Sequence, residues 1–246
     1  MVPGLSDRMT RTLVILTLNE IDGVRAIVPR IPPGVADEVL AVDGGSTDGT
    51  RQYLTEAGIR ICDQERRGRG EAFRVAMAKA KGEHVVFFSP DGNEDPADIE
   101  RLFAALANGA DMAIASRFAV GSRNEEDDSW LPLRKWVNQA FTWMANAIWN
   151  RHGPTVTDTI NGFRGLRRAA FDAIAPTSAG ATVEYELTIG AMREKMSIVE
   201  IATVEGDRVG GETKVASWST GVAFLKLLLR EIAADLRRRS SPASRA

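Results

Sequence analysis

Polar side chains that could bind a metal ion follow a short apolar run near the middle of the chain. Val85–Phe88 has the length of a buried β-strand and is too short for a helix. It leads into the segment 89–95 (S-P-D-G-N-E-D), where Pro90 lacks a backbone donor and Gly92 permits unusual dihedral angles, so we expect a tight turn. Carboxylates held there suit an oxygen-loving divalent cation. The alternative is a turn that only caps a helix starting near Pro96.

Two earlier apolar runs end in similar turns. Thr12–Leu18 leads into Asn19-Glu20, and Glu38–Val42 leads into the segment 43–50 (D-G-G-S-T-D-G-T). Because strands alternate with helices here, we expect a parallel sheet with right-handed crossovers, which brings the three turns to one edge. Ligands bind at that edge in open α/β sheets. The turns would offer carboxylates for a ribose or base, glycines for close approach and a carboxylate for a metal on a diphosphate.

The sequence lacks the common phosphate-binding motifs. No G-x-x-x-x-G-K-[ST] occurs, and Gly44-Gly45 lacks the G-x-G-x-x-G spacing of a dinucleotide fold. A sugar-1-phosphate nucleotidyltransferase would need a Gly-rich basic loop after the first strand, where this chain has Asn19-Glu20. The pattern therefore indicates a nucleotide-diphosphate site without a phosphate loop.

The composition narrows the class of protein and its compartment. The chain has 246 residues, enough for one large α/β domain, and 31 Lys and Arg against 33 Asp and Glu, which argues against a nucleic-acid binder. Its single cysteine, Cys62, fits a reducing compartment. Leu13–Leu18 is too short for a signal peptide, and no apolar run approaches the roughly 20 residues that span a bilayer. We expect a cytoplasmic protein, soluble or in peripheral contact with the inner face of the membrane.

The rest of the chain continues the same alternation and then becomes more helical. We expect further strands over 59–62, 112–115 and 198–204. We expect helices from 20 to 29, from 47 to 57, and over 68–81, 95–107, 131–151 and 218–239, with another after Thr182.

Six motifs, taken in order, resemble those of the inverting family-2 glycosyltransferases of GT-A fold. They are T-L-N-E (17–20), V-D-G-G-S-T-D-G-T (42–50), G-R-G-E-A (68–72), S-P-D-G-N-E-D-P (89–96), S-R-F (116–118) and N-G-F-R (161–164). Within that family the chain is most similar to the dolichyl- or polyprenyl-phosphate sugar transferases, over roughly residues 12 to 214. The resemblance implies a Rossmann-like α/β domain over 1–216, with a mostly parallel central sheet flanked by helices. Its nucleotide-sugar half would be 1–117 and its acceptor half 118–216, before a C-terminal amphipathic helix and tail over 217–246.

The resemblance also implies site residues for the nucleotide sugar and a metal. The expected nucleotide-sugar ligands are Thr17, Asn19, Glu20, Asp43, Gly45, Gly70 and Asp91. Asp91 would hold Mg²⁺ or Mn²⁺ on the diphosphate, with Asn93 close by. The usual Asp-x-Asp metal motif is Ser89-Pro90-Asp91 here, so its first carboxylate is missing, and Leu16 replaces the usual Pro of the first motif. One carboxylate can still hold such a cation, because these sites use substrate phosphates and waters.

Basic residues of the second half would bind phosphates. We expect Arg117, Arg134 and Arg164 to contact the acceptor, and Arg117 to join Asp91 in catalysis. The segment 208–214 (R-V-G-G-E-T-K) resembles the R-x-G-G-x-[ST]-K segment of relatives, so Arg208 and Lys214 would neutralise charge on the leaving nucleoside diphosphate. The alternative is a basic surface loop.

Two helices carry apolar faces with open interpretations. In the helix over 131–151, Trp136, Ala140 and Trp143 share one face, which would either pack in the core or touch a membrane or prenyl chain. In the helix over 218–239, an apolar stripe would lie in a headgroup layer, pack on its own domain or contact a twin subunit in a homodimer.

These expectations combine into inverting transfer of a hexose from a GDP- or UDP-hexose to a polyprenyl phosphate. A phosphate acceptor is already anionic, so positioning and charge stabilisation suffice. A hydroxyl acceptor would need a base, for which Asp91, Glu184 and Asp158 are candidates, although Glu184 could equally be a helix cap. A third reading, prompted by Ser89, is a nucleotide-sugar-binding protein with little or no turnover.

Overall fold

The computed structural model describes residues 10–124, 127, 133–151, 153–209 and 217–240. The chain forms two compact units, Met1–Glu212 and Thr213–Ala246. The first unit holds a seven-stranded sheet with its flanking helices, and the second is built on one long helix, α8 (Ser217–Ser240).

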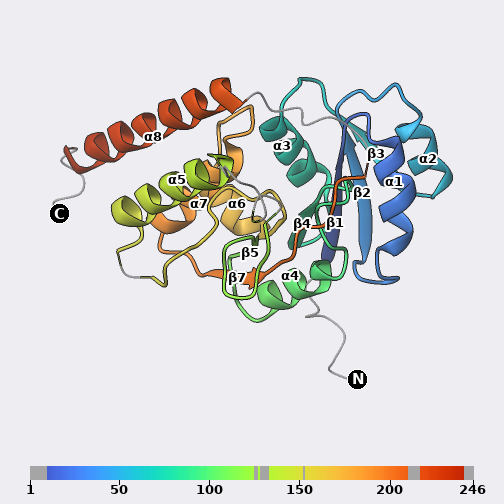
Figure 1. Cartoon of the computed structure of the whole chain (residues 1–246), viewed down its shortest axis with the longest axis horizontal. Helices are drawn as coiled ribbons and strands as arrows, with labels where there is room; N and C mark the ends of the chain where they lie inside the picture. The colour runs from blue at the N-terminus through green and yellow to red at the C-terminus, as the bar shows by residue number, and fades with distance from the viewer. Residues whose placement is uncertain (1–9, 125–126, 128–132, 152, 210–216, 241–246) are drawn as a thin grey trace, which may run out of the picture. The chain divides into compact units, whose positions relative to one another are not determined.

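The sheet has the strand order β3-β2-β1-β4-β6-β5-β7 (Figure 1). The strands are β1 (Arg11–Thr17), β2 (Glu38–Asp43), β3 (Arg60–Asp63), β4 (His84–Phe88), β5 (Met112–Ser116), β6 (Arg164–Arg167) and β7 (Ile198–Ala202). β6 runs antiparallel to both of its neighbours, and the other pairings are parallel. A mostly parallel α/β sheet is therefore confirmed.

The strand register brings the three polar turns together. Thr17 at the end of β1 is paired with Asp43 at the end of β2, and Ile15 of β1 is paired with Phe88 at the end of β4. β1 lies between β2 and β4, so the turns after these strands are neighbours at the carboxyl edge of the sheet. This placement was expected from the alternation of strands and helices, and it is confirmed.

Helices cover both faces of the sheet. They are α1 (Ile21–Ile27), the short 3₁₀-helix η1 (Val28–Arg30), α2 (Thr50–Glu56), α3 (Arg69–Lys79), α4 (Asp98–Ala107), α5 (Leu133–Trp149), α6 (Arg168–Ile174) and α7 (Val183–Arg193). Phe87 and Phe88 point to opposite faces, as consecutive strand residues do. Phe87 stacks on Phe73 of α3 at 3.9 Å, whereas Phe88 packs in the cluster filled by α4.

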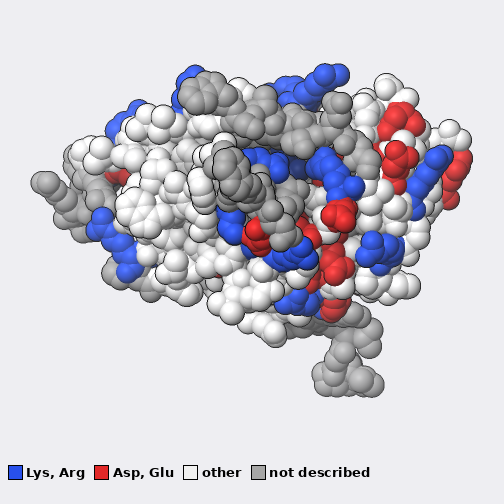
Figure 2. Space-filling view, in the orientation of Figure 1, with Lys and Arg blue, Asp and Glu red and all other residues white. Residues whose placement is uncertain are grey.

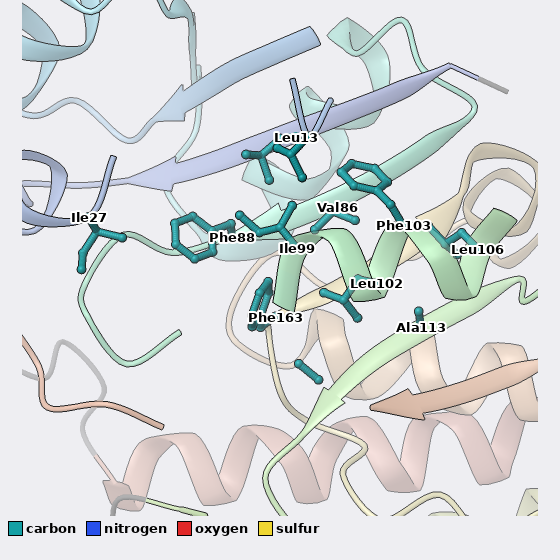
Figure 3. Packing of buried hydrophobic residues seen from close by; sticks show 12 residues of the cluster. Leu13, Ile27, Val86, Phe88, Ile99, Leu102, Phe103, Leu106, Ala113 and Phe163 are labelled. Carbon is teal, nitrogen blue, oxygen red and sulfur yellow. The ribbon is translucent and has the colours of Figure 1, made fainter. Parts of the chain in front are cut away.

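The core between the sheet and α4 contains a large cluster of buried apolar side chains. Figure 3 shows Ile99, Leu102, Phe103 and Leu106 of α4 beside side chains from the strands. These α4 residues recur at helical spacing and are fully buried. Burying each such side chain contributes about 1.5–3 kcal/mol to stability, and this packing fixes β4 and the turn that follows it.

β6 is the main difference from the expected elements. Its sequence R-G-L-R has one large apolar residue, Leu166, so it lacks the apolar run that marks the other central strands. It becomes a strand because β4 and β5 pair with it on both sides. Gly165 helps, because a side chain there would press against Leu106 of α4.

The aromatic residues of α5 do not all lie in the same environment. Phe141 and Trp149 are buried, as core packing requires, whereas Trp136 and Trp143 are exposed. Among the residues that the structure describes, no helix is both long and apolar enough to cross a membrane.

Candidate active site

Two loops at the carboxyl edge, residues 17–21 after β1 and 43–50 after β2, form what we call the β1–β2 platform. Asp43 is its centre and is almost completely buried. One carboxylate oxygen accepts hydrogen bonds from the backbone N–H groups of Gly45 and Ser46 and from Arg51, and the other accepts from the hydroxyls of Thr17 and Ser46. Burial alone would raise the pKa of Asp43, but these hydrogen bonds outweigh it and lower the pKa.

Further hydrogen bonds join the two loops of the platform. The Asn19 side-chain oxygen accepts from the Thr47 N–H at 2.8 Å, and the Glu20 N–H donates to the Thr50 hydroxyl at 2.9 Å. Asn19 has φ 51°, a left-handed conformation that Asn tolerates better than most residues. The predicted ligands Thr17 and Asp43 therefore use their side chains to shape the platform itself.

The third turn, residues 89–95 after β4, is the β4 turn. The segment 205–209, which follows β7, lies against it through two backbone hydrogen bonds, Val209 N–H to Asp91 O at 2.7 Å and Gly206 N–H to Asn93 O at 3.0 Å. We call this segment the strap. Arg208 of the strap donates to the Asp91 carboxylate at 2.7 Å. The structure thus brings together two predicted site residues that are far apart in the sequence.

Glycine is required at position 92 by the close approach of the strap. Gly92 has φ 95°, and a Cβ there would lie 2.7 Å from the carbonyl oxygen of Asp207 and 2.9 Å from the Val209 nitrogen. A side chain would therefore push the strap, and Arg208 with it, away from Asp91.

The β4 turn carries an excess of acidic groups. Burial and the neighbouring charge of Asp91 raise the pKa of Glu94 well above its ordinary value, and Glu205 of the strap adds to the rise. The Ser89 N–H donates to the Glu94 carboxylate at 2.6 Å and opposes the rise. Figure 2 shows acidic and basic side chains intermixed in the middle of the face drawn. A cation brought to this turn would relieve the repulsion.

The donors of the β4 turn fit Mg²⁺ or Mn²⁺ by chemical type. Asp91 and Asn93 offer oxygen atoms, which these cations prefer, and a bound cation would favour the charged form of Glu94, whose pKa is raised without one. Among the described residues, no group of three or more His, Cys, Asp or Glu is arranged to hold a metal ion. Such a cation would therefore depend on phosphate oxygens and water for its remaining ligands.

An ion pair that sequence reasoning did not find lies beside this turn. Arg69, at the start of α3, donates to the carboxylate of Glu184, at the start of α7. The charges of Glu94 and Asp91 also act on Arg69. The second Glu184 oxygen, Oε2, is buried without a hydrogen-bond partner among the described residues. Arg69 lies within the G-R-G-E-A motif, but no local pattern reveals a pairing with a residue 115 positions later.

The glycines around Arg69 allow two parts of the chain to touch. A side chain at Gly70 would overlap the carbonyl oxygen of Ser178, and one at Gly68 would overlap that of Ala179. Gly70 thus serves a backbone contact between α3 and the loop before α7. Gly45, by contrast, is exposed and has open space around it.

The three predicted acceptor residues lie in different environments. The Arg117 guanidinium donates two hydrogen bonds to Asp158, at 2.7 and 3.0 Å, its backbone N–H donates a third at 3.2 Å, and both residues have little exposure. Burial would raise the pKa of Asp158, but the charge and hydrogen bonds of Arg117 lower it. Arg134 is exposed on the first turn of α5.

Arg164 has no exposed surface. Its guanidinium donates to the backbone oxygens of Asn161 and Glu184 and to the Thr188 hydroxyl, and burial lowers the pKa of Arg164 to about 10. Arg164 therefore joins the segment before β6 to α7 through hydrogen bonds and does not face solvent. Lys214, predicted beside Arg208, lies outside the described residues.

The amino-acid sequence matches known proteins over most of its length. Residues 12–175 match the model of the family described as "Glycosyl transferase family 2". Glycosyltransferase AglJ of Haloferax volcanii is 27% identical over 222 residues, which cover 87% of this chain and 69% of the relative. Polyprenol monophosphomannose synthase of Mycolicibacterium smegmatis is 29% identical over 234 residues, which cover 88% and 85%.

A solved structure shares the fold. It is glucosyl-3-phosphoglycerate synthase from Mycobacterium tuberculosis in complex with Mn²⁺, uridine diphosphate and phosphoglyceric acid. The TM-score is 0.68 at 23% sequence identity, covering 95% of this chain and 80% of that one. A GT-A-like α/β architecture, expected from the motifs, is therefore confirmed.

Proposed function

The chain belongs to glycosyl transferase family 2 and is a glycosyltransferase, and from that premise we propose that it moves a hexose from a nucleotide-diphosphate sugar to a polyprenyl phosphate with inversion. The observation that carries the proposal is the contact of Asp91 with Arg208 at the carboxyl edge of the sheet. Acidic and basic groups from distant parts of the chain meet there, next to the β1–β2 platform.

The chain's own residues would bind and orient the donor. The β1–β2 platform, with Asn19, Glu20 and Gly45 at its surface, would hold the nucleoside, and the diphosphate would extend toward the β4 turn. Asp91, with Asn93 close by, would hold Mg²⁺ or Mn²⁺, which supplies charge neutralisation of the departing diphosphate. Arg208 and Arg69 are cations beside the same turn and would stabilise the same developing charge.

A lipid phosphate is the favoured acceptor. The relative from Mycolicibacterium smegmatis, aligned over most of both chains, is named a polyprenol monophosphomannose synthase. A phosphate oxygen is already a nucleophile, so its attack on the anomeric carbon, with the nucleoside diphosphate leaving from the opposite face, needs no strong base. The protein then acts by positioning and charge stabilisation.

A hydroxyl acceptor is the second candidate, because Glu184 offers a buried carboxylate oxygen without a partner among the described residues. Of the other two candidate bases, Asp158 is held by Arg117 at both oxygens and Asp91 by Arg208 at one. A base also needs a free oxygen to take up the proton that it removes, and of the three candidates Glu184 has one in Oε2.

Transfer assays separate these candidates. Labelled GDP- and UDP-hexoses are mixed with polyprenyl phosphate, with and without EDTA, and product is measured in the organic phase. We expect organic-extractable label with one donor, reduced by EDTA and retained in Glu184→Gln. Absence of such product with every donor would exclude the lipid acceptor. Water-soluble product with a hydroxyl acceptor, lost in Glu184→Gln, would support the second candidate instead.

A further inference from the structure

The outer face of α5 is a continuous apolar stripe. Its large side chains Leu133, Trp136, Val137 and Trp143 are 56%, 56%, 47% and 71% exposed. Ala140 and Ala147 are exposed on the same side, at the three- and four-residue spacing that aligns side chains along a helix. Phe141, Ala145 and Trp149 occupy the opposite side and are buried. The helix therefore meets its own core on one face and leaves an equally apolar face uncovered.

The chemistry of this stripe suits a membrane surface. Single exposed apolar residues are ordinary, but a contiguous apolar strip marks an interaction site. Tryptophan favours the headgroup level of a bilayer, where one part of its ring system is apolar and another is wet. In the face drawn in Figure 2, the surface over α5 is mostly uncharged.

Charge around α5 complements an anionic bilayer. The helix sequence contains Arg134 and Lys135 and no Asp or Glu, although Lys135 forms an ion pair with Asp127 just before the helix. At its carboxyl end, Arg151 and Lys195 are exposed, and Arg193 lies over the Trp149 ring with its guanidinium 6.0 Å from the ring centre. Glu194 lies in the same region, which leaves an excess of positive charge. Anionic lipid headgroups attract basic groups placed in this way.

The size of the stripe disfavours a second copy of the chain as its partner. A helix of 17 residues is about 25 Å long and about 10 Å wide, which gives a footprint of about 250 Å². A specific protein interface needs about 800 Å² from each partner. A bilayer imposes no such requirement, because binding there grows with whatever apolar area is inserted and with electrostatic attraction.

We propose that the exposed face of α5, built on Trp136 and Trp143, docks the protein on the surface of an anionic phospholipid bilayer. The inference adds to the proposed function, because a polyprenyl phosphate is held in a bilayer. It is tested without donor or acceptor, so failure of either proposal leaves the other to be judged separately.

The test is sedimentation of the full chain with vesicles of phosphatidylcholine and phosphatidylglycerol in equal parts, and with phosphatidylcholine alone. We expect binding to the mixed vesicles that weakens as salt is raised. Trp136→Ser/Trp143→Ser should reduce the partition coefficient at least about tenfold, since two large apolar groups are lost. Arg151→Gln/Lys195→Gln should weaken binding to the mixed vesicles by about fivefold for each charge and leave binding to phosphatidylcholine unchanged.

Leu225→Ser/Leu229→Ser on α8 is the matched control, because these side chains are 49% and 57% exposed. It should retain binding within about twofold; a loss there as well would add a second contact and leave the α5 assignment standing. Wild-type binding by Trp136→Ser/Trp143→Ser overturns the proposal. So does a wild-type chain that ignores vesicles and forms a dimer that this variant dissociates.

A folding control accompanies the vesicle test. All three double variants alter exposed side chains, so their circular dichroism spectra and their thermal shift with nucleoside diphosphate and Mn²⁺ should match the wild type. Trp143→Ser alone, at the most exposed of the two tryptophans, replaces the double variant if that chain folds poorly, and it is judged by the same two outcomes.

Discussion

The β1–β2 platform and the β4 turn lie side by side and are stabilised in different ways. In the platform, the central carboxylate of Asp43 is buried and accepts five hydrogen bonds, and its pKa is lowered. In the β4 turn, Asp91 is held by a cation from the strap, and the pKa of the neighbouring Glu94 is raised. In the platform, hydrogen bonds and Arg51 balance the charge of Asp43. In the β4 turn, neighbouring acidic groups repel one another in spite of Arg208.

This difference assigns separate roles to two carboxylates that look alike in the sequence. A carboxylate with all its acceptor positions filled contributes to stability and to the shape of the loop. A carboxylate next to repelling acids is poised to gain from an incoming cation, at some cost to the empty protein. Substitutions in the platform should therefore change stability more than chemistry, and those in the β4 turn should do the reverse.

Asp91→Asn should give the largest effect, on transfer. Removing a group that stabilises charge in the transition state typically lowers the rate about 100- to 1000-fold. Stability should change little, because loss of the contact with Arg208 is offset by relief of repulsion on Glu94. Initial rates of hexose transfer and a thermal melt measure the two quantities. A melting temperature that falls as steeply as the rate would erase the distinction between the regions.

Asp95→Asn serves as the control for that substitution. Asp95 is exposed in the same turn, and its side chain accepts from the Ala97 N–H before α4. Asparagine caps helices about as well as aspartate, so rate and stability should both stay within about twofold of the wild type. A rate loss like that of Asp91→Asn would show that the turn responds to any lost charge.

Asp43→Ala should have the opposite profile. It leaves the donors of Thr17, Gly45 and Ser46 without their acceptor, whereas Arg51 keeps Asp63, and unsatisfied buried donors at about 1–3 kcal/mol each bring the total cost to about 3–5 kcal/mol. For a chain of this size the melting temperature should fall by about 6–12 °C or more. Asp63→Ala removes the other carboxylate that pairs with Arg51. Because the Asp63 side chain is 72% exposed, its loss should cost less than about 1 kcal/mol. Equal losses in the two variants would contradict a buried platform.

Gly92→Ala and Gly45→Ala compare the two regions with the backbone conformation matched. Both glycines have φ 95°, so alanine is strained at either position by about 1–2 kcal/mol. Gly45 has open space, whereas a Cβ at Gly92 meets the strap. Gly92→Ala should therefore cost about 1–2 kcal/mol more in chemical denaturation and also slow transfer by displacing Arg208. Identical denaturation curves for the two variants would mean that the strap is not in place.

The three strands that lead into the site could be predicted from the sequence because their signals are local. β1, β2 and β4 are apolar runs, and each is followed by polar, Gly- or Asn-bearing residues that are typical of a turn. Their meeting at one edge then follows from the alternation of strands and helices. β6 gave no such signal, since Arg164–Arg167 becomes a strand only by pairing with β4 and β5.

Contacts between distant side chains could be predicted only in part. The resemblance assigned Asp91 and Arg208 to the same diphosphate, and the structure brings the two side chains into contact. Neither resemblance nor spacing paired Arg69 with Glu184, because that contact depends on α3 and α7 approaching through Gly70. Burial is equally invisible in the sequence: nothing in the motif that contains Arg164, a predicted acceptor residue, indicates that its side chain is fully buried.

The smallest expected effect is a dependence of stability on pH that arises from His84, at the start of β4. It falls in a different pH range from the effect of Asp43 in the platform. His84 is fully buried, and neither ring nitrogen has a partner among the described residues. Burial, with the charges of Arg167 and Arg11, lowers the pKa of His84 from 6.5. Since the unfolded chain binds the proton more readily, the stability is present above pH 6.5 and is lost as pH falls through the folded-state pKa, by about 1.4 kcal/mol for each unit of the shift.

His84→Leu should remove the loss of stability that begins as pH falls below 6.5, while leaving the loss from Asp43 in place. The lowered pKa of Asp43 makes its contribution present above 3.8 and lost only as pH falls further, so the two groups act in different windows. Urea denaturation at pH 7.5, 6 and 5 measures the difference. A wild-type chain whose stability is flat over this range would mean that His84 finds a partner in solution. A variant that keeps the wild-type slope would instead place the acid loss in other groups, such as the acids at the carboxyl edge of the sheet.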